Sequence, residues 1–233
     1  MLHCIFETVL GDAVLGSLDV WSVLKLLFSF SEKKCITKTI YKILSNKNKR
    51  EWNKISRFTL PETFICEFHN KVDWTRISKH QELSEEFIRE FRDRVDWYWI
   101  SRCQELSECF ISEFRDMVHW STISIQQDLS NKFIREFRNY VNWEIISEYK
   151  NLPENLISKF RERVNWRCIS RYQKLSEAFI REFWDRVYWK WIFSYQNLSE
   201  DFIREFRNRI SWREISKKNK SCRRISSTSL EKG

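Results

Sequence analysis

Glycine and proline are almost absent from this sequence. Its 233 residues include 3 Gly and 2 Pro, and the stretch from 17 to 232 contains no glycine. All-β sandwiches and barrels need many tight turns that usually use glycine, and phosphate-binding loops of the glycine-rich kind require it. The composition therefore disfavours an all-β fold and excludes such a phosphate loop from residues 17–232.

The cysteines and histidines do not follow the spacing of disulfide frameworks or metal sites. There are 7 Cys and 4 His, with no Cys-x-x-Cys pair. Disulfide frameworks usually have an even number of cysteines, and zinc sites usually have paired ligands. We therefore predict free thiols in a reducing compartment, with no metal and no cofactor. Hydrolase motifs such as Gly-x-Ser-x-Gly and His-Glu-x-x-His are missing too, so we predict a protein that is not an enzyme, with no catalytic residues.

The N-terminal region is apolar but is interrupted by charges. Residues 13–30 contain Asp19 and Lys25, whereas a membrane-spanning helix needs about 20 largely uncharged residues. The region also lacks the basic start and the small-residue cleavage site of a signal peptide. We expect a soluble protein with no membrane partner.

Aromatic residues are abundant, with 12 Trp and 18 Phe, and many recur at a fixed interval. Leucine recurs every 23 residues from Leu60 to Leu198, and tryptophan follows the same period after a first step of 22. The tryptophans are Trp52, Trp74, Trp97, Trp120, Trp143, Trp166, Trp189 and Trp212. A fixed period of about 20–50 residues is typical of stacked helical repeats.

Each unit has the pattern of two short helices. The first begins at a serine or proline such as Ser84 or Pro61, residue types that suit a cap and a first helical turn. Phe87, Phe91 and Val95 then share one face. A cap-type residue precedes the tryptophan in five units and predicts a second helix that begins there. These residues are Asp73, Asp96, Asn142, Asn165 and Ser211.

We therefore predict an all-α fold, an α-solenoid of seven 23-residue two-helix repeats with a helical N-terminal cap. One unit buries too little apolar surface to fold alone, so neighbouring units must complete its core. The predicted domains are a cap or F-box-like segment at 1–57 that includes a degenerate repeat, the solenoid at 58–220 and a basic disordered tail at 221–233.

The net charge of +9 is concentrated outside the repeats. Residues 33–57 carry a net charge of +8 and residues 213–233 carry +5, whereas residues 58–212 carry −1 and residues 1–32 carry −3. A nucleic-acid-binding solenoid would have a basic face on its repeats. The basic flanks have two interpretations. They could be solvent-exposed ends with no binding role, or they could bind nucleic acid or act as nuclear-import signals.

Charges within the repeats follow helical spacing. Six pairs of opposite charge lie four residues apart and are predicted to stabilise single helices. They are Glu85–Arg89, Glu177–Arg181, Glu200–Arg204, Glu90–Arg94, Glu182–Arg186 and Glu205–Arg209.

An arginine stripe, one residue per unit at one position, is the first candidate binding surface. It could contact an acidic peptide or phosphates, or it could form a solvated ladder whose stems cover neighbouring aromatic rings. Its members are Arg92, Arg115, Arg138, Arg161 and Arg207, with His69 and Trp184 in the other two units.

The variable positions after the repeat tryptophan form the second candidate. Tyr98 and Trp99 in one unit, and Lys190 and Trp191 in another, break an otherwise mixed pattern. Aromatic residues at variable positions often mark a binding surface, although they could equally pack against the adjacent helix.

The repeat resembles those of proteins encoded by giant nucleocytoplasmic DNA viruses, of the marseillevirus-like and mimivirus-like kinds. The segment Leu83-Ser84-Glu85-Glu86-Phe87-Ile88-Arg89-Glu90-Phe91, followed by Val95, Trp97, Ile100, Ser101 and Gln104, carries this resemblance. It implies a viral source and an interaction role, acting on host or viral proteins in the host cytoplasm or nucleus.

Residues 18–52 are similar to an F-box, from Leu18, Val20 and Trp21 through to Trp52, although Asp19 stands where that module has proline. This similarity implies docking to a Skp-type adaptor of a ubiquitin ligase. The favoured hypothesis is a non-enzymatic scaffold that binds protein partners. One alternative is an F-box-like substrate adaptor, and another is nucleic-acid binding through the flanks. If the F-box similarity is only that of a generic amphipathic helix, residues 1–57 are an N-terminal cap.

Overall fold

The computed structural model describes residues 44–209, and every regular element in that range is helical. These residues form two compact units, 44–118 and 119–209, and the boundary in the sequence falls within the third repeat. The predictions made for residues 1–43 and 210–233 lie outside the described range. They include most of the N-terminal cap and F-box-like segment, the cap at Ser211 and the basic tail.

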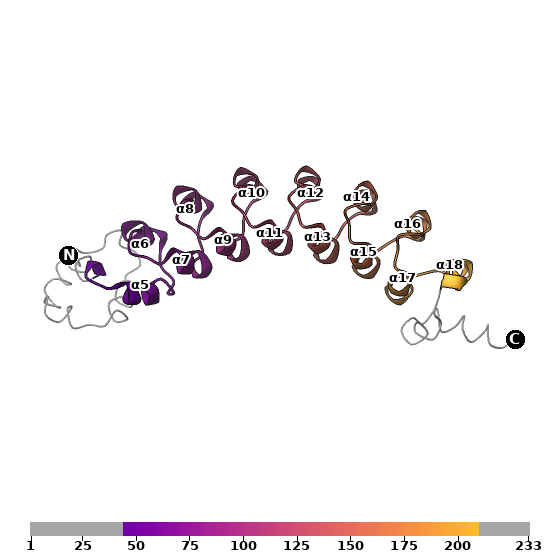
Figure 1. Cartoon of the computed structure of the whole chain (residues 1–233), viewed down its shortest axis with the longest axis horizontal. Coiled ribbons are helices and arrows are strands. Elements are labelled where there is room, and N and C mark those ends of the chain that lie inside the picture. The colour runs from indigo at the N-terminus through magenta and orange to yellow at the C-terminus, as the bar shows by residue number, and fades with distance from the viewer. Residues whose placement is uncertain (1–43, 210–233) are drawn as a thin grey trace, which may run out of the picture. The chain divides into compact units, whose positions relative to one another are not determined.

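Unit 1 contains six helices in two layers (Figure 1). One layer holds the first helix of each repeat, and the other holds α5 and the second helices. The elements are α5 (Lys49–Ile55), α6 (Glu62–Glu67), α7 (Trp74–His80), α8 (Glu85–Glu90), α9 (Trp97–Cys103) and α10 (Glu108–Glu113).

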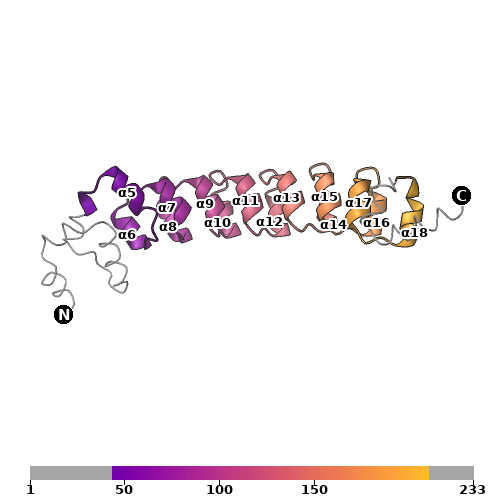
Figure 2. The same ribbon diagram turned by 90° about the horizontal axis from the view of Figure 1, so that it is seen from below.

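Unit 2 repeats this arrangement, with its helices side by side in each layer (Figure 2). Its elements are α11 (Trp120–Gln126), α12 (Asn131–Glu136), α13 (Trp143–Tyr149), α14 (Glu154–Lys159), α15 (Trp166–Tyr172), α16 (Glu177–Glu182), α17 (Trp189–Tyr195), α18 (Glu200–Glu205) and a short 3-10 helix, η1 (Arg207–Arg209). The predicted all-α fold of 23-residue two-helix repeats is confirmed for the described residues.

The serine at the start of the first helices is the predicted cap, and these helices are short. Ser84 is the N-cap of α8, and its hydroxyl accepts the backbone N–H of Phe87. Pro61 and Pro153 are N-caps as well, not first-turn residues, with φ near −66° and −69°. Phe91 is already the C-cap of α8, so Val95 reaches the core from the following turn and not from the helix.

The second helices begin where the sequence predicted. The Asp96 carboxylate accepts the N–H groups of Tyr98 and Trp99, and Asn142 and Asn165 make the corresponding bonds in α13 and α15. These side chains satisfy N–H groups that the first turn of a helix cannot satisfy internally. In α5 the tryptophan is the fourth helical residue, which agrees with a degenerate repeat of altered spacing.

The repeat tryptophan packs against the pair of phenylalanines in the next repeat. The ring centre of Trp97 lies 5.0 Å from that of Phe114 and 6.2 Å from that of Phe110. Trp166 contacts Phe183 in unit 2 at 5.1 Å. This aromatic ladder joins neighbouring repeats within a unit, and it explains why the tryptophan has a fixed position.

A buried glutamine takes the place of glycine at the ends of the second helices. Helices often end at a glycine with positive φ, but no described residue has a positive φ. Gln81 is instead an extended C-cap. The side chain of Gln104, one repeat later, donates to the carbonyls of Gln81 and Ser78 and accepts the N–H of Leu83. The ends of α7, α13 and α15 are therefore each completed by a glutamine of the next repeat.

Half of the predicted ion pairs are present, and two others are replaced by pairs between repeats. The structure confirms Glu85–Arg89, Glu177–Arg181 and Glu200–Arg204. It corrects Glu90–Arg94, Glu182–Arg186 and Glu205–Arg209, because the first helices end at the glutamate and a partner four residues later is no longer on the same helical face. Arg186 pairs instead with Glu162 at 2.8 Å, and Glu205 with Arg181 at 3.0 Å.

Candidate partner-binding surfaces

The arginine stripe lies in the turns that follow the first helices. Arg92 and Arg115 belong to unit 1, and Arg138, Arg161 and Arg207 belong to unit 2. All five residues are exposed. The backbone carbonyls of Arg92, Arg138 and Arg161 accept the indole N–H of the repeat tryptophan five residues later. The backbone at this position therefore holds the repeat tryptophan in place, and the arginine side chain faces solvent.

Several stripe arginines have an acid as their sequence neighbour. The guanidinium of Arg92 lies 3.9 Å from Asp93, and that of Arg161 lies 3.6 Å from Glu162. Glu162 is shared, because Arg186 is closer and is the main reason that the pKa of Glu162 is lowered. The stripe therefore offers arginines whose charge is partly balanced nearby.

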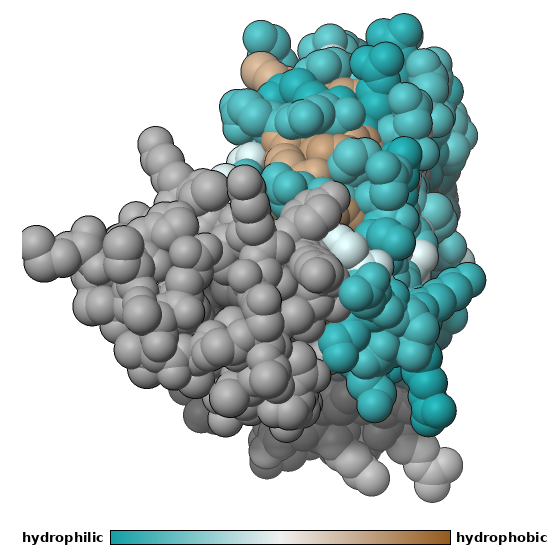
Figure 3. Space-filling model, turned by 90° about the vertical axis from the view of Figure 1, so that its left-hand side faces the viewer, coloured by the Kyte–Doolittle hydropathy of each residue, from teal (hydrophilic) through white to brown (hydrophobic). Residues whose placement is uncertain are grey.

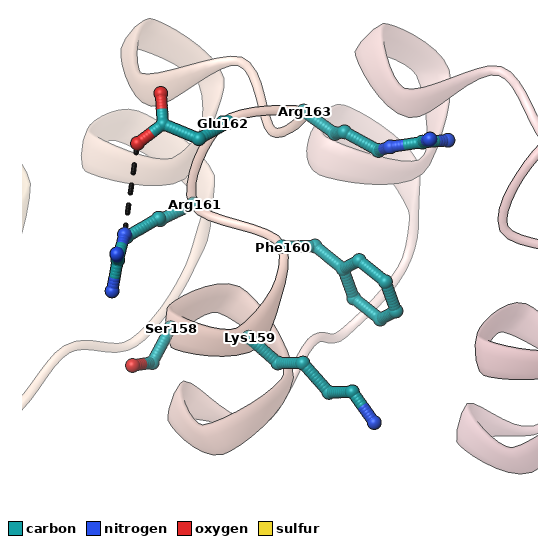
Figure 4. A pocket seen from close by; sticks show the side chains of 6 residues that line it. All are labelled: Ser158, Lys159, Phe160, Arg161, Glu162 and Arg163. Atoms are coloured by element: carbon teal, nitrogen blue, oxygen red, sulfur yellow. Dashed lines mark ion pairs between the residues drawn. The ribbon is translucent and has the colours of Figure 1, made fainter.

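Figure 4 shows the stripe position of one repeat in detail. The last two residues of α14 and the turn that follows, 158–163 in all, line an open hollow in which Arg161 points toward Glu162 and away from Phe160. A ligand there would contact only this one helix end and its turn. Small-molecule sites are usually concave and apolar, with a few polar groups that converge on the ligand, so this hollow suits a surface contact better than an enclosed ligand.

The second candidate in unit 1 is a cluster of aromatic rings and cations on α7 and α9. Nζ of Lys79 lies 4.2 Å from the ring centre of Trp99, and the guanidinium of Arg102 lies 5.9 Å from the same ring. Tyr98 meets Trp99 edge to face and accepts a hydrogen bond from Arg102. Tyr98 is 40% exposed and Trp99 is half-buried. The structure thus places Trp99 against the adjacent helix while Tyr98 faces solvent.

Unit 2 has a corresponding cluster on α15 and α17. The guanidinium of Arg171 lies 4.9 Å from the ring centres of both Trp191 and Tyr172, and 5.9 Å from that of Tyr195. Nζ of Lys190 lies 5.7 Å from Trp191. Trp191 occupies the same repeat position as Trp99, so each unit presents a tryptophan held by cations on its second-helix layer.

Sequence reasoning missed a tyrosine stripe in unit 2. Tyr149, Tyr172 and Tyr195 are the last residues of α13, α15 and α17, and they are 61%, 44% and 48% exposed. The signal was present, because the three tyrosines lie 23 residues apart. Sequence reasoning also missed Arg171, whose Nε is buried without a hydrogen-bond partner among the described residues.

The histidine, cysteine and acidic side chains of the described residues form no metal-binding group. Between residues 44 and 209, no three His, Cys, Asp or Glu side chains gather as a metal site would require. Cys66, Cys103, Cys109 and Cys168 are free thiols. Burial is the main reason that the pKa of both Cys66 and Cys168 is raised. None of the helices described has the length and apolar character of a membrane span.

Comparison of the chain with protein-family models, curated proteins and solved structures gives no match.

Proposed function

We propose that this protein is a non-enzymatic repeat scaffold that binds a protein partner through its layer of second helices. The observation that carries the proposal is the position shared by Trp99 and Trp191. In the other described repeats this position holds Arg76, Thr122, Ile145 or Cys168, none of them aromatic. In these two repeats it holds a large aromatic ring with arginine or lysine against it. Trp, Tyr and Arg are the residue types that dominate the energetics of protein interfaces.

Exposure of the neighbouring rings supports this choice of surface. Tyr98 in unit 1 and the tyrosine stripe in unit 2 place large, partly apolar rings in solvent. Tyrosine loses little conformational entropy on binding and offers both apolar area and a hydroxyl group. A protein surface that covers these rings would gain buried area at small entropic cost.

The arginine stripe is the competing surface within the same proposal. Its side chains are more exposed than Trp99 and Trp191, and they lie in the turns after the first helices. We favour the second-helix layer because the neighbouring acids already partly balance Arg92, Arg115 and Arg161. The partner stays unnamed. A viral or host protein is what the resemblance to giant-virus repeat proteins suggests, with the host cytoplasm or nucleus as the location.

Partner capture with matched tryptophan variants tests the proposal. The full chain and the double variant Trp99→Ala, Trp191→Ala serve as baits for cross-linking and mass spectrometry in cell extract. The control is Trp184→Ala, which removes an exposed tryptophan from the arginine-stripe position. We expect the double variant to lose specific partners and the control to keep them. Loss of partners with Trp184→Ala alone would assign binding to the stripe, and no partner above background would refute the proposed function.

A further inference from the structure

Positive charge gathers at one place on the second-helix layer of unit 1. Arg57 follows α5, Arg76 and Lys79 lie on α7, and Trp99 and Arg102 lie on α9. We call these five residues the basic–aromatic patch. Bonds between repeats fix the elements that carry it, since the hydroxyl of Ser56 accepts the N–H of Asp73, and that of Ser78 accepts the N–H of Asp96.

Three cations of the patch, Arg57, Arg76 and Lys79, lie close enough to His80 to act on its charge. His80 is adjacent to Lys79, and its pKa is lowered first by partial desolvation and then by the charges of Lys79, Arg57 and Arg76. Lys79 also contacts Trp99, which connects this group to α9. Lys79 therefore belongs both to the group of charges around His80 and to the aromatic group on α9.

Much of this charge is not balanced by the described residues. Arg76 pairs with Asp73 at 3.1 Å. Within residues 44–209, no ion pair involves Arg57, Lys79 or Arg102. Unpaired cations beside an aromatic surface are suited to bind carboxylates or phosphates.

The matching surface of unit 2 is different. In the register that aligns Trp191 with Trp99, Arg171 occupies the position of Lys79, but Cys168 and Ser194 stand where unit 1 has Arg76 and Arg102. Glu148 stands where unit 1 has Arg57, and Glu144 lies on the same helix, α13. The charges of these two glutamates raise the pKa of Cys168 while those of Arg167 and Arg171 lower it, so both signs act at one place. The excess of positive charge on the patch is thus a property of particular residues and not of the repeat.

Nearby acids limit the kind of anion that can bind. Glu82 and Glu105 follow the ends of α7 and α9 and line one open hollow. A long phosphate backbone that continued past the patch would meet these carboxylates, whereas a short acidic peptide could bind within it. Seen from the end with α5 and α6, the described surface is mostly hydrophilic with a small apolar area (Figure 3).

We propose that the basic–aromatic patch binds a short acidic segment of a partner protein, with carboxylates at Arg57, Lys79 and Arg102 and an apolar or aromatic side chain against Tyr98 and Trp99. This proposal rests on the proposed function, because it names the chemistry of the partner. It differs from a role for the arginine stripe, which lies in other turns.

Fluorescence anisotropy with defined probes tests the assignment. The probes are a fluorescein-labelled synthetic peptide rich in Asp and Glu with a few Leu and Phe, and single-stranded oligothymidylate of equal net charge. The patch variant is Arg57→Glu, Lys79→Glu in the full chain. The matched control is Arg167→Glu, Lys174→Glu, which reverses two exposed charges of unit 2 and alters the net charge equally. Circular dichroism verifies that both variants are folded.

The wild type should bind the peptide, and the patch variant should bind it about tenfold more weakly. The control should stay within about twofold of the wild type, and Trp99→Leu should weaken binding without a change of charge.

Absence of peptide binding by the wild type at low salt, or an equal loss in the control, would overturn the proposal. Tighter, patch-dependent binding of oligothymidylate would assign the patch to nucleic acid. If the peptide fails but partner capture still depends on Trp99 and Trp191, the proposed function survives and only the acidic segment is refuted.

Discussion

The side-chain amide of Gln104 donates a hydrogen bond over 2.7 Å to the backbone carbonyl of Gln81, the same position one repeat earlier. Its oxygen accepts the N–H of Leu83 at 2.9 Å. Both glutamines are buried. The pattern recurs in unit 2, where Gln196 bonds to Gln173 and Leu175. One buried amide therefore satisfies a carbonyl at the end of a helix of the preceding repeat and an N–H at the start of its own repeat. It joins the two repeats in this way.

Replacement of this amide should be costly. We predict that Gln104→Met lowers the free energy of unfolding by about 2–4 kcal/mol, because buried carbonyl and N–H groups are left without partners. Urea unfolding followed by circular dichroism measures the change. Gln126→Met is the matched control, since Gln126 is exposed on α11, and it should change stability by no more than about 0.5 kcal/mol. Equal losses in the two variants would show that the ladder contributes nothing specific.

Lys150 interrupts the glutamine ladder in unit 2. Its Nζ donates to the carbonyls of Gln127 and Ile125, but an ammonium group has no acceptor to offer Leu129, whose counterparts in other repeats bond to glutamine. We predict that Lys150→Gln raises the midpoint of thermal unfolding, whereas Lys150→Met lowers it. A lower midpoint for Lys150→Gln would contradict this account.

The same lysine predicts a pH dependence. Desolvation lowers the pKa of Lys150 from its ordinary value of 10.5. Between the lowered pKa and 10.5 the unfolded chain binds the proton more strongly, so this group makes stability rise with pH in that window. The difference in unfolding free energy between wild type and Lys150→Gln should therefore become smaller as pH rises toward 10.5. A constant difference across pH would show that Lys150 has an ordinary pKa.

The aromatic ladder gives a second stability test. Trp97 packs on Phe110 and Phe114, and its indole N–H donates to the Arg92 carbonyl. We predict that Trp97→Ala costs about 2–4 kcal/mol in urea unfolding. Trp184→Ala removes an exposed ring and should cost less than about 1 kcal/mol. The interpretation of the repeat tryptophan as core fails if both variants lose the same stability.

The sequence was sufficient for the repeat, the second-helix caps and the core, because each depends on one residue type at a fixed period. It was not sufficient for bonds between repeats. Arg186 was assigned to Glu182 by helical spacing, yet the helix ends at Glu182 and the partner is Glu162 in the previous repeat. Such contacts depend on how two units stack, which local spacing does not determine.

The candidate surface was predictable only in part, for the same reason. Tyr98, Trp99 and Trp191 stand out as aromatic residues at variable positions. Arg57, Lys79 and Arg102 do not, because they are 22 or 23 residues apart and each resembles an ordinary helix surface residue. Stacking brings them to one patch and places Lys79 on Trp99.

His80 offers a direct spectroscopic measure of that patch. Partial desolvation and then Lys79, Arg57 and Arg76 lower its pKa from the ordinary value of 6.5. We predict that Lys79→Gln raises the His80 pKa toward 6.5. The pKa should not be fully restored, because desolvation and the two arginines remain. An NMR pH titration that follows the imidazole resonances measures the change. The folded chain binds this proton less readily than the unfolded chain does. The free energy of unfolding therefore falls as pH is lowered through 6.5. The fall should be smaller in Lys79→Gln. Arg167→Gln, in unit 2, is the control and should leave His80 unchanged. A His80 pKa that does not respond to Lys79→Gln would mean that these cations are too far apart to act as one binding surface.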